Sequence, residues 1–316
     1  MPLDVPTHLA LGLDQPTPAL VNARSNADIQ AALDHPSDRQ YQPCPEATML
    51  NGIEQGSFTR IHQWRDTDLF RATERDLAVY LPAGAPSEDL RLLICNDGMA
   101  YASLSGPIRV TRVLDALYAR GEIAPTAVIF INPGIPLGPI EISPTPSYTP
   151  EATQRSIEYD SLTPTYGEFL ITEVLPWVQA EFGVSFSANP AHKTVCGISS
   201  GGICAFSAAW FHPDHFQRVI SHCGSFTNIR GGHNFPYLVR ATDRKPIRAY
   251  LQSGTNDGTT IFGDWPTANQ AMAKALAYAG YDYRFDFGQG GHTLRHAGSV
   301  FADTLRWLWR EDAAAE

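Results

Sequence analysis

The stretch that decides the fold reads TVCGISSGG over residues 194–202, and an apolar run over residues 203–211 follows it. The residues before the first glycine are typical of a short buried strand, and those after the last glycine are typical of a buried helix. Between them stands G-x-S-x-G, which in a strand, turn and helix setting is a nucleophile elbow. Glycines are needed there because a side chain would collide with the neighbouring strand or helix. We therefore predict that Ser199 is a nucleophile at the end of a strand.

Strand-like and helix-like segments alternate on both sides of this motif. We expect strands at 57–64, 75–81, 90–95, 127–131, 193–197, 218–222, 247–253 and 281–287, and helices at 108–120, 166–182 (interrupted by Pro176), 200–211, 266–279 and 300–309. Such alternation predicts one α/β domain with a mostly parallel sheet, helices on both faces and two antiparallel strands at its start.

Two segments lack this pattern. Residues 1–55 are irregular and contain one short helix candidate near residues 27–33, and we expect them to pack as an N-terminal arm on a catalytic domain at 56–316. Residues 133–159 are rich in Pro, Ser, Thr and Tyr and show no helical or strand period. A connection of that length is usually a functional cover or disordered, so a cover over the site is expected, and its mobility is left open.

Composition excludes several classes of partner. The net charge of −10 and the pI of about 5.4 argue against binding to nucleic acid or anionic membranes, which favour clustered Lys and Arg. No apolar stretch is long enough to cross a bilayer. The first residues lack a basic region followed by a long apolar segment, so a cytoplasmic location is expected. The sequence is compatible with a homo-oligomer.

Cysteines and histidines do not indicate a metal site. The five cysteines are odd in number and show no C-x-x-C spacing, which favours buried free thiols. His212 and His215 flank the end of a predicted helix, and no zinc-ligand spacing links them to an acid. We expect neither a metal nor another cofactor.

A serine hydroxyl is a weak nucleophile and needs a base, which in turn needs an orienting acid. In α/β-hydrolases these follow in the order Ser, acid, His, each after a strand. Asp257 directly follows one predicted strand, and Asp264 in the same loop is the alternative acid. His292 follows the last predicted strand through a glycine-rich turn, and His296 is the alternative base, although it falls where a helix should begin. We favour Asp257 and His292.

An acyl-transfer site also needs two backbone N–H groups that stabilise the developing oxyanion. The elbow supplies the amide of Ser200 at the start of the following helix, where unpaired donors and the helix dipole favour an anion. The loop after the third strand should supply the second N–H group. Gly98 in this loop is small and allows the backbone to approach closely, and we choose the Met99 amide as the donor. Asp97 is then expected to hold that loop.

These segments together resemble the α/β-hydrolase esterase family that includes esterase D and enterochelin esterase. The resemblance rests on NDGM (96–99), GISSGG (197–202), SGTND (253–257) and GGH (290–292), with further similarity at RSIEYD (155–160), 265–270 and LRWLW (305–309). It spans about residues 57–310 and is most specific at the elbow and the ordered acid and histidine.

The resemblance implies an eight-stranded hydrolase sheet. It implies Ser199, Asp257 and His292 as the triad and the amides of Met99 and Ser200 as the oxyanion hole. It also suggests that Arg155 and Glu158 lie at the mouth of the site as an ion pair that orders the long loop. The alternative is that they only brace the helix near Thr163.

The function expected from these features is a serine esterase that acts through an acyl-enzyme on a small to medium, aryl or polar ester. An acyltransferase that uses the same triad with an alcohol or sugar acceptor is the alternative, and a binding module without chemistry is a third interpretation. The partner is then a small-molecule ester. Our pocket candidates are Tyr101, Arg155, Glu158, Tyr159, Phe226 and Trp265.

Overall fold

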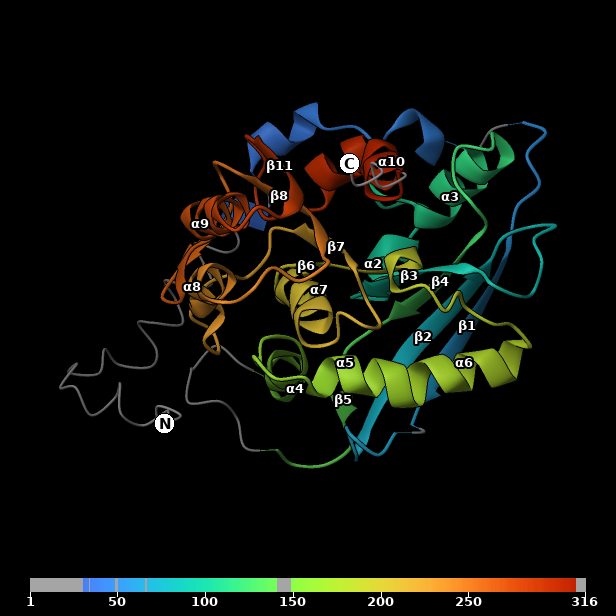
Figure 1. The fold of residues 1–316 in the computed structure, drawn as a ribbon, viewed down its shortest axis with the longest axis horizontal. Helices are drawn as coiled ribbons and strands as arrows, with labels where there is room; N and C mark the ends of the chain where they lie inside the picture. Colours follow the sequence, from blue (N-terminus) through green and yellow to red (C-terminus); the bar gives the residue numbers. More distant parts are fainter. Residues whose placement is uncertain (1–30, 34, 49–50, 66, 141–148, 311–316) are drawn as a thin grey trace.

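The structure is a computed structural model that describes residues 31–33, 35–48, 51–65, 67–140 and 149–310 (Figure 1). Its sheet has the strand order β1-β2-β4-β3-β6-β7-β8-β11, and the two-residue β5 adds to β2. The pairs β1–β2 and β2–β4 are antiparallel, and the pairs from β4 to β11 along this order are parallel. The predicted α/β-hydrolase architecture, with a mostly parallel eight-stranded sheet, is therefore confirmed.

The elements have the following bounds. The strands are β1 (Ser57–Trp64), β2 (Thr73–Leu81), β3 (Arg91–Asn96), β4 (Thr126–Ile131), β5 (Ile135–Pro136), β6 (Lys193–Ile198), β7 (Arg218–His222), β8 (Arg248–Gly254), β9 (Thr259–Thr260), β10 (Gly263–Asp264) and β11 (Asp282–Gly288). The α-helices are α2 (Gly98–Ala102), α3 (Val110–Ala119), α4 (Pro150–Tyr159), α5 (Thr165–Phe169), α6 (Leu175–Phe182), α7 (Ser200–Phe211), α8 (Phe235–Ala241), α9 (Trp265–Tyr278) and α10 (Arg295–Leu308). Short helices are η2 (Pro36–Gln40), η3 (Pro45–Ala47), η4 (Leu170–Val174), η5 (Pro190–His192) and η6 (Gly232–Asn234).

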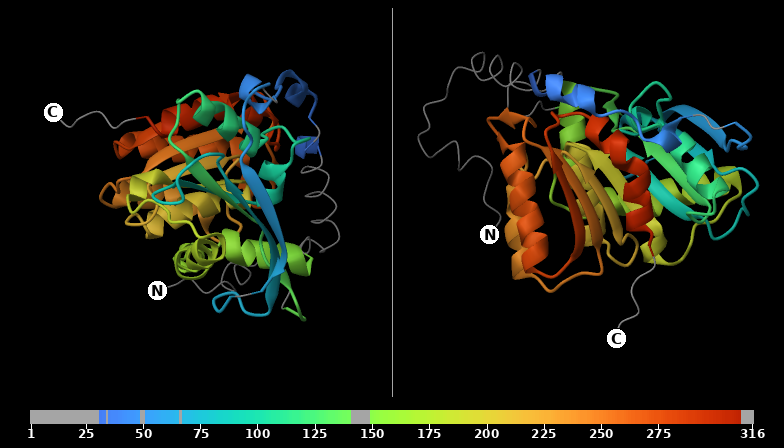
Figure 2. Two further views of the ribbon diagram at one scale, coloured as in Figure 1. Left: turned by 90° about the vertical axis from the view of Figure 1, so that its right-hand side faces the viewer. Right: turned by 90° about the horizontal axis from the view of Figure 1, so that it is seen from above.

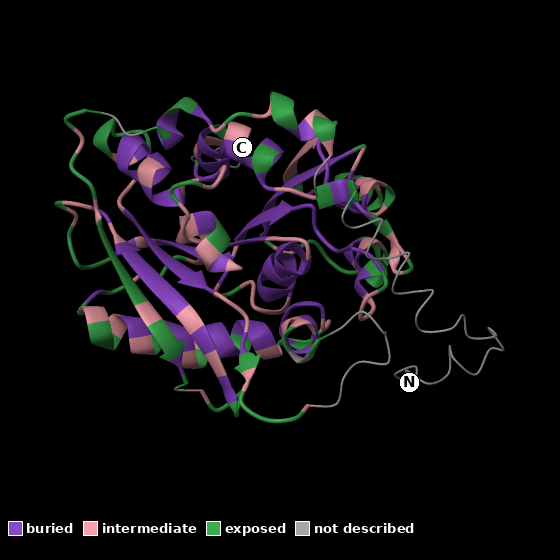
Figure 3. Cartoon of the chain, turned by 180° about the vertical axis from the view of Figure 1, so that it is seen from behind, coloured by how far each residue is buried: buried purple, intermediate pink, exposed green. Residues whose placement is uncertain are grey.

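Two hydrophobic cores lie on the two faces of the sheet. Because side chains alternate along a strand, Leu92 and Ile94 of β3 enter one core, and Leu93 and Cys95 enter the other. Helices α3 and α10 cover the second face, and α5 to α9 cover the first (Figure 2). The buried colour runs through the central strands, whereas β1 at the edge is largely exposed (Figure 3). No helix among the described residues is long and apolar enough to cross a bilayer.

Two local expectations are wrong. The segment 133–159 contains the helix α4, which begins after Thr149, whose side chain accepts a hydrogen bond from the Ala152 amide at 3.2 Å. Its buried residues include polar ones such as Thr153 and Ser156, so the helix leaves no apolar period in the sequence. Residues 141–148 of that segment lie outside the described residues.

Pro176 does not interrupt the helix expected at 166–182. Helix α5, the π-helical turn η4 and α6 follow one another without a break, and Pro176 lies in the first turn of α6. A π-helical turn shifts the hydrogen-bond register of the backbone by one residue, which accommodates the missing proline N–H and its ring. The proline therefore changes the type of the preceding turn instead of ending the helix.

The C-terminal half of α4 is attached to the sheet by a buried ion pair. Both side chains of Arg75 on β2 and Glu158 on α4 are fully buried, with Nη1 and Oε2 at 2.7 Å. Glu158 also accepts hydrogen bonds from the Gly134 amide at 3.1 Å and from Gln154 at 2.9 Å. The Arg75 guanidinium lies 4.6 Å from the centre of the Phe169 ring. These partners compensate the desolvation of two charges, so loss of either member would leave an unpaired buried charge.

Asp160, the residue after α4, carries a buried carboxyl group whose ionisation destabilises the folded protein. It is 2% exposed, and neither carboxylate oxygen has a partner that meets hydrogen-bond geometry among the described residues. Burial raises its pKa from the ordinary 3.8 to about 6, although the Arg155 guanidinium and the Ser156 and Ser200 hydroxyls nearby oppose the rise. Compared with the unfolded chain, the folded protein therefore favours the protonated form of Asp160.

We predict that Asp160→Asn removes a pH-dependent loss of stability. Because the pKa is higher in the folded state, the folded protein binds more protons than the unfolded chain between pH 4 and 6, and the free energy of unfolding falls as the pH rises through that window. The shift from 3.8 to about 6 corresponds to a cost of about 3 kcal/mol above pH 7. Urea unfolding at pH 4.5 and 7.5 should show the variant gaining stability over wild type mainly at pH 7.5.

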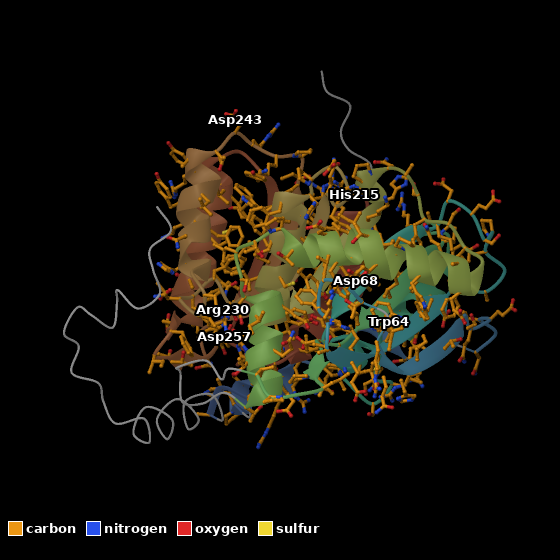
Figure 4. All side chains as sticks on the ribbon, turned by 90° about the horizontal axis from the view of Figure 1, so that it is seen from below. Trp64, Asp68, His215, Arg230, Asp243 and Asp257 are labelled. Carbon is orange, nitrogen blue, oxygen red and sulfur yellow. The ribbon has the colours of Figure 1, made fainter. Side chains whose placement is uncertain are left out.

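The matched control is Asp243→Asn, since Asp243 is exposed at the periphery of the molecule (Figure 4). It should leave the difference between the two pH values as in wild type. An Asp160→Asn variant with the same stability change at both pH values would contradict the account.

Candidate active site

Ser199 lies at a sharp turn between β6 and α7. Its backbone has φ 59° and ψ −123°, which is unusual for a residue with a side chain. A Cβ atom at Gly197 would lie 2.3 Å from the carbonyl oxygen of Gly201, so only glycine fits where the strand meets the helix. The turn leaves Ser199 partly exposed while Ser200 begins α7 and is buried.

An acid and a histidine meet at the ends of β8 and β11. The Nδ1 atom of His292 lies 2.5 Å from Oδ1 of Asp257, whose side chain is fully buried. Asp257 also accepts hydrogen bonds from the Ser253 hydroxyl at 2.6 Å and the Gly258 amide at 2.7 Å, which fix the carboxylate. A Cβ at Gly254 would lie 2.2 Å from the oxygen of Gly290, so the two loops touch through their backbones.

A chain of contacts joins this pair to Ser199. The Ser199 hydroxyl lies 3.2 Å from the hydroxyl of Ser225, which accepts a hydrogen bond from Trp265 Nε1 at 3.3 Å. The Trp265 ring is in turn edge-on to the His292 ring, with centroids 5.7 Å apart. Among the described residues, the hydrogen bond of the Ser199 hydroxyl is to Ser225 and none joins it to His292. Catalytic hydrogen bonds are often loose before substrate binds, so this geometry is compatible with a later Ser199–His292 contact.

The two alternative residues are engaged elsewhere. Asp264 caps α9, and its side chain accepts a hydrogen bond from the Thr267 amide at 2.9 Å. His296 lies inside α10, stacks on Tyr41 with ring centroids 4.3 Å apart and is 3.2 Å from the Gln252 amide nitrogen. The structure therefore brings Asp257 to His292 and keeps the alternatives in structural contacts.

The two amides expected at an oxyanion hole differ in their surroundings. The Ser200 amide is at the N-terminus of α7, where no backbone acceptor within the helix is available. The Met99 amide donates a hydrogen bond to Oδ1 of Asn132 at 3.2 Å. Its use by an oxyanion requires the Asn132 side chain to turn away. Asp97 precedes α2 with φ 51° and accepts two hydrogen bonds from Arg155, at 2.9 and 2.7 Å, so it holds this loop.

Four of the six expected pocket residues are in the interior, which corrects that expectation. Tyr101 is hydrogen-bonded to Nδ1 of His222 at 2.8 Å, and Tyr159 accepts a hydrogen bond from the Asp97 amide at 3.3 Å. Phe226 packs against the first core, and Glu158 binds Arg75. All four are at most 2% exposed, so they cannot contact a substrate in this conformation. The sequence pattern could not separate aromatic core residues from pocket residues.

Arg155 and Glu158 do not form the expected ion pair. They lie three residues apart on α4, but Arg155 pairs with Asp97 and Glu158 pairs with Arg75. Arg155 is therefore attached to the loop that carries Met99, and Trp265 remains beside His292. Of the pocket candidates, these two lie beside the site.

Cys223 and Ser225 were missed in the sequence although both follow the end of β7. Cys223 Sγ, a carboxylate oxygen of Asp257 and a ring nitrogen of His292 lie within 4.8 Å of one another, a grouping that could hold a metal ion. Burial and the Asp257 charge raise the pKa of the Cys223 thiol, so the thiolate that a metal needs is disfavoured. Their place in the sequence could have indicated them. Strands β6 and β7 are parallel neighbours, so the residues that follow β7 lie next to the turn that follows β6.

Comparisons with known proteins bear on the family and the fold. The family model described as Putative esterase matches residues 71–308. Iron(III) enterobactin esterase of Dickeya dadantii (strain 3937) is 30% identical over 156 residues, which cover 44% of this chain and 34% of that protein. The chain thus spans about a third of this curated relative.

Solved structures share the fold. Enterobactin esterase FES from Shigella flexneri, crystallised in the presence of 2,3-dihydroxy-N-benzoyl-serine, superposes with a TM-score of 0.62 at 22% identity over 85% of this chain and 62% of that chain. The ferulic acid esterase AmCE1/Fae1A from Anaeromyces mucronatus has a TM-score of 0.61 at 18% identity, over 84% and 95% of the two chains. Because the family model covers most of the chain, this protein belongs to the esterase family of α/β-hydrolases.

Proposed function

We propose that this protein is a serine carboxylic ester hydrolase in which Ser199, His292 and Asp257 form a catalytic triad. The observation that carries the proposal is the position of the Asp257–His292 pair, 2.5 Å apart, at the same edge of the sheet as the strained turn at Ser199. A buried carboxylate bound to Nδ1 orients the ring so that Nε2 is left for the serine.

The reaction follows from these roles. His292 takes the proton of Ser199 as its oxygen attacks the ester carbonyl carbon, and the Ser200 and Met99 amides stabilise the oxyanion. His292 then donates this proton to the leaving alcohol, which gives the acyl-enzyme. A water molecule, deprotonated by His292, releases the acid and restores Ser199.

The substrate is proposed to be a small to medium ester with an aryl or polar group. FES was crystallised in the presence of 2,3-dihydroxy-N-benzoyl-serine, and AmCE1/Fae1A is a ferulic acid esterase. Both compounds contain an aromatic acid group. An aromatic ester of comparable size is therefore the first class to test on this chain.

The N-terminal segment supports the loop that carries His292. The His292 amide donates a hydrogen bond to the Ala32 carbonyl oxygen at 2.9 Å, and the Gly291 amide donates to Asp38 at 3.2 Å. The Gln289 amide donates to the Tyr41 hydroxyl at 2.9 Å. Three contacts thus hold the turn between β11 and α10, which supports a role of this N-terminal segment in positioning the base. Of the expected helix at 27–33, residues 31–33 are helical and 27–30 lie outside the described residues.

Ser199→Ala is predicted to lower kcat for 4-nitrophenyl acetate by at least about a thousandfold, because the nucleophile is lost. The circular dichroism spectrum should be unchanged, since only one oxygen is removed. Ser207→Ala, on the helix α7 that follows Ser199, is the matched control and should retain the wild-type rate. Retained activity in Ser199→Ala would refute the assignment.

Asp38→Ala should lower kcat about tenfold while KM changes little. It removes the acceptor of the Gly291 amide next to the base, and one hydrogen bond to a charged group is worth about 1.5–3 kcal/mol. Arg39→Ala, at an exposed neighbour in η2, should have no effect on either constant. Equal kcat values for Asp38→Ala and wild type would show that the arm does not position His292.

A further inference from the structure

A cleft of about 450 Å³ is lined by His292 and by the loop before α3. Its lining includes Ile198, the residue before the nucleophile, together with Pro107 and Arg109 from that loop. A volume in this range is typical of a small-molecule site. The cleft therefore adjoins the proposed catalytic site at Ile198 and His292.

The position of His292 assigns a part of the substrate to this cleft. In the proposed mechanism His292 donates a proton to the oxygen of the leaving alcohol, so atoms attached to that oxygen must lie against the histidine. The wall of the cleft beyond it includes the apolar side chains of Leu33, Pro43 and Leu294, which suit the carbon skeleton of an alcohol. This step rests on the proposed function.

Charge indicates what that alcohol carries. Arg109 and Arg295 both line the cleft, and within the described part of the chain neither forms an ion pair. Other arginines in the same layer do: Arg120 after α3 and Arg306 on α10 both pair with Glu46. These two arginines give the described lining of the cleft a positive charge, in a chain whose net charge is −10.

Arg109 is also oriented by the protein. Its Nε donates a hydrogen bond to the Gly106 carbonyl oxygen at 2.9 Å, which leaves the two terminal nitrogens for another acceptor. Among the described residues that line the cleft, none is Asp or Glu. A planar guanidinium held in this way suits a carboxylate, which it can bind through two parallel hydrogen bonds.

We propose that this cleft binds the leaving alcohol of the ester, and that this alcohol bears a carboxylate recognised by Arg109 and Arg295. The preferred substrates are thus esters of hydroxy acids or hydroxybenzoates acylated on their hydroxyl group. Hydrolysis cleaves the bond between the acyl carbon and that hydroxyl oxygen, and releases the hydroxy acid with its carboxylate unchanged.

The test compares two pairs of esters. On the alcohol side, 4-acetoxybenzoate is compared with its neutral methyl ester, and release of the acetyl group is followed by chromatography. On the acyl side, mono-4-nitrophenyl glutarate is compared with 4-nitrophenyl pentanoate. For each pair the ratio of kcat/KM for the charged ester to that for the neutral ester is measured in wild type, Arg109→Gln, Arg295→Gln and the control Arg112→Gln on α3.

Wild type is expected to prefer 4-acetoxybenzoate, and Arg109→Gln should lower the alcohol-side ratio by about tenfold, as expected for loss of a charge-assisted hydrogen bond. Arg295→Gln should lower it by a smaller factor because Arg295 is exposed. Arg112→Gln should leave both ratios at the wild-type value, and 500 mM salt should weaken the wild-type preference.

Other outcomes would refute the carboxylate site, the assignment of the alcohol to the cleft or the proposed function, and the measurements distinguish the three. An unchanged alcohol-side ratio in both cleft variants, with Ser199-dependent hydrolysis of the neutral esters intact, would refute the carboxylate site alone. A loss confined to the glutarate pair would place the acyl group in the cleft and refute the assignment to the alcohol. Hydrolysis of none of the four esters by a Ser199-dependent route would refute the proposed function as well.

Discussion

The backbone turn at Ser199 is the constraint on which the site depends. Its φ of 59° is held because β6 ends and α7 begins with no intervening loop, and because Gly197 leaves room for the Gly201 carbonyl. Such strain persists only when the surroundings determine it, and here the buried helix α7 packs against β6 and β7, which are neighbours at the centre of the parallel sheet. The packing of α7 offsets the conformational cost of the turn. The turn in return leaves the Ser199 hydroxyl above the sheet edge.

Parallel strands carry their C-terminal loops to one edge, and this explains why the sequence predicts so much of the site. Ser199, Asp257 and His292 each follow a predicted strand in the order Ser, acid, His, which already indicated that they converge. The structure adds the 2.5 Å contact between Asp257 and His292 and the engagement of Asp264 and His296 elsewhere. The fold was predictable for the same reason, since buried strands and amphipathic helices leave periodic patterns.

Features held by polar contacts were not predictable. Helix α4 is fixed by Glu158 and Arg155, whose partners lie about 60 to 80 residues away in sequence, on β2 and in the loop before α2. The support of His292 by Ala32 and Asp38 joins segments more than 250 residues apart. A local periodic pattern in the sequence cannot indicate contacts between such distant segments. The resemblance between motifs also does not extend to the N-terminal arm. The burial of Tyr101 and Phe226 likewise depends on which helix covers them.

Acylation of Ser199 is the step on which the proposed mechanism depends. Ser225 makes a demanding comparison because its hydroxyl lies 3.2 Å from that of Ser199. The most direct measurement is to treat the full chain with a fluorophosphonate probe and to locate the adduct by peptide mass spectrometry. We expect one adduct, on Ser199, and we expect it to form much more slowly in His292→Ala. An adduct on Ser225 or Cys223, or labelling that is unaffected by loss of His292, would contradict the proposed mechanism.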